Sequence, residues 1–180
     1  MTRPLTPHRQ TVTPMSDTTP NNANGGGDNG PPSLIVVAQY LKDLSFESPR
    51  APASFRDPGP TPQLEVDVNV NARNLDASVY EVELSVAARA RRNADLSFVV
   101  EATYAGAFEI KNVPREQLEA VMLVECPRLL FPFLRQIISD ATRNGNFPPL
   151  MLEPIDFFAV YQQRAAQQSQ AQAKAQPVNA

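Results

Sequence analysis

The sequence predicts an α+β fold in which an antiparallel sheet is followed by two helices. Between Leu34 and Ile110 apolar residues recur at every second position, which is typical of strands. After Val113 the apolar spacing becomes helical. Because the period changes only once, a block of strands precedes a block of helices and the two do not alternate.

Three strands follow one another closely in the first block. QLEVDVNVN (63–71) alternates apolar with polar residues, and YEVELSVAARA (80–90) repeats that pattern. RRNAD (91–95) then reads as a hairpin turn before the strand LSFVVEATY (96–104). Gly106 interrupts the apolar row ahead of Phe108 and Ile110, which indicates a bulge or a close approach of another segment. Strands joined by such short turns are antiparallel.

A further strand is expected earlier, over 34–47. Its alternation assigns one side to Leu34, Val36, Ala38, Tyr40, Leu44 and Phe46, and the other side to Gln39, Asp43, Ser45 and Glu47. The proline-rich segment 48–62 is too long for a hairpin turn. We therefore expect this strand to lie at an end or edge of the sheet.

A long helix is expected over 114–143. Pro114 suits a first helical position, Gly145 would supply a left-handed cap, and the prolines at 148–149 prevent continuation. A second helix is expected to begin near Pro154.

Two prolines stand inside the long helix. An interior proline costs ~3 kcal/mol or more. Most of this cost disappears if Pro127 opens a new helix after a break at Cys126, which leaves Pro132 as the kink. The stretch LLFPFL is apolar on nearly all sides, so the helix must be covered on more than one face. One sheet covers one face, and a second copy of the chain is the simplest cover for the other.

The chain divides into a core and two tails. Residues 1–32 are rich in Thr, Pro, Asn and Gly and are expected to be disordered. Residues 33–164 form the single folded domain. Residues 165–180 are rich in Gln and Ala and are expected to fray or to be disordered.

Composition excludes several classes of function. A net charge of -3 does not favour binding to nucleic acid. Cys126 is the single cysteine, so no intrachain disulfide can form, and no apolar run reaches the ~20 residues that span a bilayer. The N-terminus lacks the apolar segment of a secretory signal. These features favour a soluble cytoplasmic protein.

Residue content also argues against most enzyme chemistry. His8 is the only histidine and stands in a polar lead-in, so neither a metal cluster nor a catalytic triad is expected. No nucleotide-binding glycine motif occurs. We expect no cofactor and no enzymatic activity. An enzyme that uses carboxylates alone stays open, with Glu81, Glu83 and Glu101 as its only plausible acids.

Three stretches resemble the SecB family of protein-export chaperones. They are YLKDLSFESP (40–49), VYEVELSV (79–86) and CPRLLFPFLRQIISDATRNGNFPPLMLEPIDF (126–157). The resemblance runs in unbroken order from Leu34 to Arg164. It implies a homotetramer, built as a dimer of dimers, whose long helices lie between two sheets. It also implies a chaperone that binds unfolded secretory preproteins, keeps them translocation-competent and delivers them to the SecA motor ATPase.

The same resemblance implies site residues. The motor-binding surface corresponds to Asp43, Glu47, Val99 and Glu101, which strand parity places on one polar face. Periodicity alone favours a merely solvated face, so the resemblance carries this assignment. Candidate client-binding residues are Leu64, Val66, Val68, Phe98, Phe108 and Tyr161, for which plain core packing is the competing interpretation. Residues expected at the tetramer interface are Leu118, Met122 and Cys126.

One departure and two alternatives remain. Family members often carry a tryptophan shortly before the second strand, whereas this chain has no tryptophan and Pro60 stands near that place. A chaperone of the same fold could serve another client set, such as a toxin–antitoxin system, although the YLKDLSFE stretch argues against this. A small-molecule-binding or carboxylate-dependent enzyme domain is the other alternative.

Overall fold

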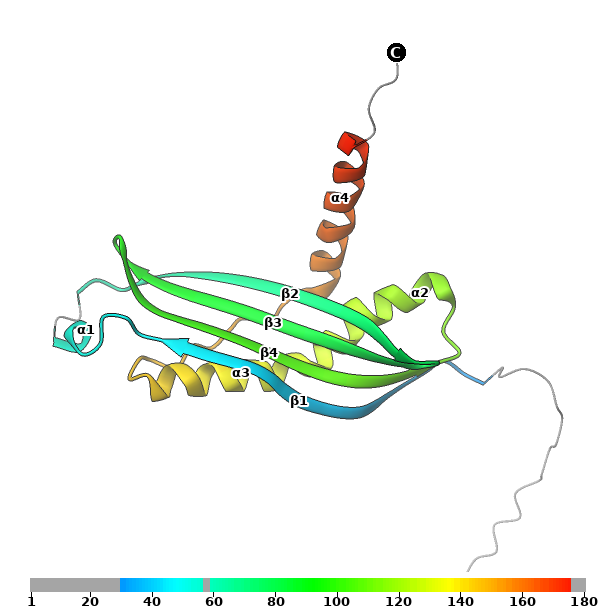
Figure 1. Ribbon diagram of the computed structural model, residues 1–180, viewed down its shortest axis with the longest axis horizontal. Helices are drawn as coiled ribbons and strands as arrows, with labels where there is room; N and C mark the ends of the chain where they lie inside the picture. Colours follow the sequence, from blue (N-terminus) through cyan, green and yellow to red (C-terminus); the bar gives the residue numbers. More distant parts are fainter. Residues whose placement is uncertain (1–29, 57–58, 176–180) are drawn as a thin grey trace, which may run out of the picture.

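The computed structural model describes residues 30–56 and 59–175 (Figure 1). Its strands are β1 (Ser33–Glu47), β2 (Gln63–Asp76), β3 (Val79–Arg92) and β4 (Asp95–Lys111). They form one four-stranded sheet in the order β1-β4-β3-β2, and all three pairings are antiparallel. The predicted α+β class is confirmed, and β1 lies at an edge as expected. The predicted N-terminal disorder falls outside the described residues, apart from 30–32.

The helices follow the strands, except for the short α1 (Ala53–Arg56) in the link between β1 and β2. α2 (Arg115–Ala120), the π-helical turn η1 (Val121–Glu125) and α3 (Cys126–Asn144) follow one another without a break. α4 (Phe157–Ala175) includes the stretch 165–175 that was assigned to the tail. Figure 1 shows α3 along one face of the sheet, with α4 projecting away from it.

The sheet therefore has a helix face, on which α3 packs, and an opposite outer face. Alternate residues of β3 and β4 are buried or half-buried on the helix face and pack in the core with α3. These strand residues include Val82, Leu84, Val86, Ala88, Phe98, Val100 and Phe108. The period-two pattern of these strands thus identifies their buried side correctly.

The predicted side assignment of β1 is only partly correct. Pairing with β4 shifts between Val36 and Ala38 and again between Leu41 and Asp43, so Val37 and Lys42 have no partner. Each unpaired residue inverts the alternation. Between the two shifts, Tyr40 pairs with Ala105 and lies on the outer face, not beside Leu34 as the alternation predicted. Ala38, which was predicted on the same side as Leu34, also lies on the outer face. Gln39 was predicted on the opposite side from Leu34, but it pairs with Gly106 and lies on the helix face.

The long helix accommodates its prolines without a break. Pro127 occupies the first turn of α3, directly after the π-helical turn, and Pro132 lies inside the helix. The chain is helical on both sides of Pro127, so the tolerance for proline at a true helix start does not apply there. The expected break at Cys126 is replaced by a wider π turn, a rare feature that occurs mostly as a single turn inside α-helices.

Two glycines are explained by close packing. A Cβ on Gly106 would lie 2.7 Å from the Phe108 ring and 3.0 Å from Leu130, so the close approach, not the bulge, is correct. Gly145 has φ of -75°, so its predicted left-handed conformation is wrong. A Cβ at Gly145 would overlap the Phe46 ring. The left-handed residue is Asn146, with φ of 63°.

Candidate functional site

The outer face carries the four residues expected to contact a motor ATPase. Asp43 pairs with Thr103, and Glu47 pairs with Val99, while Glu101 pairs with Ser45. Paired residues point to the same side of a sheet, so all four side chains lie on one face. Asp43, Glu47 and Glu101 are exposed and Val99 is half-buried. The strand parity behind this grouping is confirmed, whereas the role of the residues stays a prediction.

A shallow trough of about 220 Å³ crosses this face between Asp43 and Glu101. Arg89 binds Glu101 at 2.9 Å and Asp67 at 2.8 Å. One arginine is thus shared by two carboxylates, and Asp43 adds a further acidic group nearby. The trough therefore presents more negative than positive charge and suits a basic partner surface.

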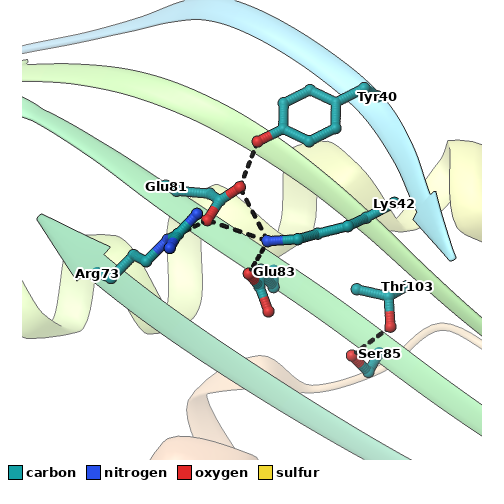
Figure 2. Close-up of polar contacts among 7 residues, drawn as sticks. All are labelled: Tyr40, Lys42, Arg73, Glu81, Glu83, Ser85 and Thr103. Carbon is teal, nitrogen blue, oxygen red and sulfur yellow. Dashed lines mark hydrogen bonds and ion pairs between the residues drawn. The ribbon is translucent and has the colours of Figure 1, made fainter. Parts of the chain in front are cut away.

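A second polar group on the outer face surrounds Glu81 (Figure 2). The Glu81 carboxylate accepts hydrogen bonds from the Tyr40 hydroxyl, Arg73 Nε and Lys42 Nζ, the last at 3.2 Å. Lys42 also binds Glu83. The hydrogen bond from Tyr40 is the largest cause that lowers the pKa of Glu81 to about 2, with Arg73 and Lys42 adding and burial opposing.

This arrangement does not suit carboxylate catalysis. A general base works best when its pKa lies near the operating pH. Glu81 has a pKa of about 2 and is held by three donors. Glu83 is bound to Lys42, and Glu101 to Arg89. All three acids that an enzyme could have used are thus engaged in ion pairs.

An apolar groove of about 610 Å³ opens beside the link between β1 and β2, and we call it the Phe98 groove. It is lined by aliphatic, aromatic and proline side chains, among them Phe55, Pro60, Leu64, Phe98, Phe147 and Leu150. The ring centroids of Phe98 and Phe147 lie 4.8 Å apart, and those of Phe55 and Phe147 lie 5.6 Å apart. Phe55 and Phe147, which stand in loop-like sequence, were not predicted.

A second groove of about 360 Å³ lies between β2 and α4, and we call it the Tyr161 groove. Val68, Val70, Leu123 and Tyr161 line it, and Arg164 Nη1 donates to the Val70 carbonyl oxygen at 2.6 Å. Leu64, Val66 and Val68 stand at alternate positions on β2, so they lie on one face. The exposed Val66 therefore connects the two grooves.

Phe108 differs from the other predicted client residues. Its side chain is 0 % exposed and lies in the core of the subunit. It therefore offers no surface to a client, and plain core packing is its role here. Phe98 is also largely buried, but it lines the Phe98 groove.

The predicted interface residues on the long helix are not its exposed ones. Cys126 is 0 % exposed, so it packs inside the subunit, and burial raises the pKa of its thiol to about 12. Leu118 and Met122 are half-buried against the core. The exposed apolar residues of α3 are Leu129 and Phe133, at 42 % and 49 %. Helical spacing alone could not separate this stripe from the buried one.

Metal-binding clusters and membrane-spanning helices are both absent from the part of the chain that the structure describes. Among residues 30–56 and 59–175, no cluster of three or more His, Cys, Asp or Glu side chains could hold a metal ion. Within the same ranges, no helix has both the length and the apolar character needed to cross a membrane.

Comparison with known proteins identifies the family. The family model described as SecB, preprotein translocase subunit SecB, matches residues 27–168. The chain is 45 % identical to protein-export protein SecB of Afipia carboxidovorans, over 91 % of this chain and 99 % of that protein. It is 52 % identical to the protein of the same name from Xanthobacter autotrophicus, over 82 % and 95 %.

The fold has a solved counterpart as well. A Mycobacterium tuberculosis SecB-like chaperone, in complex with a peptide from the HigA1 antitoxin, superposes with a TM-score of 0.57. Its sequence is 20 % identical, over 68 % of this chain and 90 % of that chain, so the likeness concerns the fold. Sequence match and fold agree, and the chain belongs to the SecB family.

Proposed function

We propose that this protein is a protein-export chaperone that binds unfolded secretory preproteins and keeps them translocation-competent. The observation that carries the proposal is the match, over nearly their full length, to relatives named protein-export protein SecB. Such a protein would meet its clients before they cross the membrane, so we further propose that it works in the cytoplasm.

The two grooves supply a mechanism for holding a client. An unfolded chain exposes apolar segments of no fixed sequence, and each buried Å² of apolar surface contributes ~25 cal/mol. Leu64 lines the Phe98 groove and Val68 lines the Tyr161 groove, and the exposed Val66 stands between them on β2, so the three offer a row of such contacts. Each contact is weak, so the client releases easily, whereas several contacts on one long chain raise the overall affinity. Holding of this kind requires neither catalysis nor a cofactor.

We further propose assembly as a homotetramer, a dimer of dimers. β1 is an edge strand with exposed apolar side chains, namely Ile35, Val36, Val37, Leu41 and Leu44. An exposed apolar edge strand invites pairing with another chain. Leu129 and Phe133 on α3 add a second apolar surface. A second copy would cover both, which supports the assembly.

The motor-contact surface is the third part of the proposal. Asp43, Glu47, Val99 and Glu101 would contact a basic surface on the SecA motor ATPase, which then receives the client. Their common placement on the outer face, opposite the face on which α3 packs, supports this. Client and motor could therefore bind the same chaperone together.

The alternatives are less well supported. The relatives at 45 % and 52 % identity are protein-export proteins, so a toxin–antitoxin client set is not favoured. The pairing of Glu81, Glu83 and Glu101 weighs against a carboxylate enzyme.

Client holding is tested by suppression of aggregation of an unfolded secretory precursor. Tyr161→Ala removes a groove residue whose burial against a client contributes ~1–3 kcal/mol, so client dissociation should accelerate about fivefold or more. Phe158→Ala is the matched control, since Phe158 is exposed on the same helix and does not line the Tyr161 groove. Equal dissociation rates for parent and Tyr161→Ala would remove this groove from the proposal.

Motor contact is tested by calorimetric binding of the motor ATPase at low salt. Asp43→Lys reverses a charge, so affinity should fall tenfold or more while client holding persists. Glu119→Lys makes the same charge change on an exposed position of α2 and should leave affinity near that of the parent. Unchanged affinity for Asp43→Lys would sink this part.

Assembly is tested by light-scattering mass. Leu129→Asp places a charge on the exposed apolar stripe of α3, which should convert tetramer to smaller species at micromolar concentration. Leu129 serves better than Met122, because Met122 also packs in the subunit core. A folded variant that keeps tetrameric mass would contradict this placement of the interface.

A further inference from the structure

Glu81 is an unusual residue for a solvated sheet face. Its side chain is only 3 % exposed, although Lys42 and Arg73 beside it are 36 % and 60 % exposed. A buried carboxylate is costly unless several donors satisfy it. Tyr40, Lys42 and Arg73 do this together, as Figure 2 shows. The chain thus maintains a buried charge whose partners all come from other strands of the sheet.

The donors to Glu81 come from both edge strands. Glu81 stands on β3, Arg73 is its direct neighbour on β2, and Tyr40 and Lys42 stand on β1. Because β4 lies between β1 and β3, these two side chains must reach across a whole strand. β4 presents only Ala107 opposite Glu81 and Ala105 opposite Tyr40. Small side chains at these positions leave the path across β4 open.

The contact coincides with the inverted segment of β1. The two register shifts bracket Ala38–Leu41, and only this inversion turns Tyr40 towards the outer face. Lys42 is itself the unpaired residue of the second shift. Glu81 therefore binds one residue inside the inverted segment and the residue that ends it.

The shifts decide where the acidic residues of β1 stand. Without the two shifts, β1 and β4 would keep the register that pairs Val36 with Phe108. Asp43 would then lie opposite Glu101, and Glu47 opposite Ser97. Two like charges directly opposite each other destabilise a strand pair. In the actual register, Asp43 faces Thr103 and Glu101 faces Ser45. The two carboxylates thus share one face without direct opposition.

We propose that Glu81 is a positioning residue: through Tyr40 and Lys42 it holds β1 in the doubly shifted register that sets Asp43 and Glu47 beside Val99 and Glu101. The effect on the motor ATPase rests on the proposed function, whereas the effect on the register of β1 does not. Glu81 itself need not touch the partner.

Amide hydrogen exchange tests the register directly. Glu81→Gln keeps the shape and removes the charge, and Tyr40→Phe removes only the hydroxyl. Both should speed exchange in the segment 38–47 by about tenfold, while β3 keeps the rate of the parent. Ser85→Ala is the control, since it removes a 2.8 Å hydrogen bond to Thr103 on the same face without involving β1. Unchanged exchange at 38–47 in both variants would overturn the proposal.

A double-mutant cycle on motor affinity tests the consequence. Glu81→Gln should weaken binding severalfold in the parent but much less in an Asp43→Asn background, because both changes act on the same contact. Full additivity would overturn the positioning role. If Asp43→Asn alone leaves affinity unchanged, the proposed motor surface fails. Exchange at 38–47 then decides the register claim by itself.

Discussion

The two faces of the sheet in this protein are stabilised in different ways. On the helix face, Leu84, Val100 and Phe108 are fully buried against α3 and its neighbours. On the outer face, polar and charged side chains predominate, and their order comes from pairs such as Arg89 with Asp67 and Glu101. Close packing therefore fixes the side chains of the helix face, and charge pairing orders those of the outer face.

This difference separates folding from recognition. A close-packed interior responds to the loss of a single methylene, so the helix face cannot change without cost to stability. Exposed charges contribute little to stability, so the outer face can be shaped for a partner. Among the charged residues that the structure describes on the outer face, Glu81 is the exception, because it is as buried as a core residue. Substitutions on the two faces should therefore differ in size and in kind.

The largest effect is expected on the helix face. Leu130 is 0 % exposed on α3, and Leu130→Ala should lower the free energy of unfolding by ~2–5 kcal/mol. Denaturant unfolding at one fixed protein concentration measures this, since assembly makes stability depend on concentration. Leu75→Ala repeats the chemistry at an exposed position of β2 and should cost less than ~1 kcal/mol. Similar losses in the free energy of unfolding for the two variants would contradict the expected difference between a buried and an exposed leucine.

The next largest effect on stability is expected at Glu81, the buried carboxylate of the outer face. At neutral pH, Glu81→Gln should cost ~1.5–3 kcal/mol, as expected for hydrogen bonds to a charged group. The folded-state pKa of Glu81 is about 2, below its ordinary value of 4.5, so its charge stabilises the fold above pH 4.5. This contribution is lost as the pH falls from 4.5 towards 2. The difference between parent and variant should therefore shrink over that range, and a constant difference would show that the charge is not involved.

The sequence predicted the buried side of β3 and β4 because their alternation is interrupted only at Gly106, where the pairing with β3 keeps its register. It failed on β1, where two unpaired residues invert the side of Ala38 and Tyr40. Lys42 falls on the predicted apolar side and Val37 on the predicted polar side, so both unpaired residues depart from the alternation. Such single departures do not by themselves identify a bulge, because exceptions also occur in regular strands. The Glu81 contact depends on that inversion, so it was not predicted either.

The long helix itself was predicted correctly, but the prediction of which of its residues are buried failed for a similar reason. Helical spacing identified an apolar helix but not which stripe faces the sheet, so Cys126 was assigned to an interface that its burial excludes. The π-helical turn at Val121–Glu125 changes which residues of α3 face the sheet, and the spacing of apolar residues does not reveal such a turn. Glycine was likewise expected at 145 for its backbone freedom, whereas the Phe46 ring is the reason for it.

A smaller effect is expected at Gly106, where the helix face meets α3. An alanine Cβ would lie 2.7 Å from the ring of Phe108 and 3.0 Å from Leu130, both of which are fully buried. Overpacking of this kind costs ~1–3 kcal/mol, so Gly106→Ala should lower the melting temperature by several degrees. Adding Leu130→Ala removes one of the two obstructing side chains, and the pair should then be less than additive. Full additivity in calorimetric melting would show that Leu130 is not the obstacle.

The smallest effect is expected at an ordinary position of the outer face. Asp67 lies 2.8 Å from Arg89, but its side chain is 77 % exposed and Arg89 keeps Glu101 as a second partner. Asp67→Asn should therefore change the free energy of unfolding by less than ~1 kcal/mol. Salt weakens interactions between exposed charges, with a Debye length of ~3 Å at 1 M, so the remaining difference should become smaller there. The loss for Glu81→Gln should largely persist in 1 M salt, since its partners reach a buried carboxylate. Asp67→Asn and Glu81→Gln could instead lower the free energy of unfolding equally and respond equally to salt. Burial would then not distinguish the two carboxylates, and Glu81 would behave as one more solvated charge on this face.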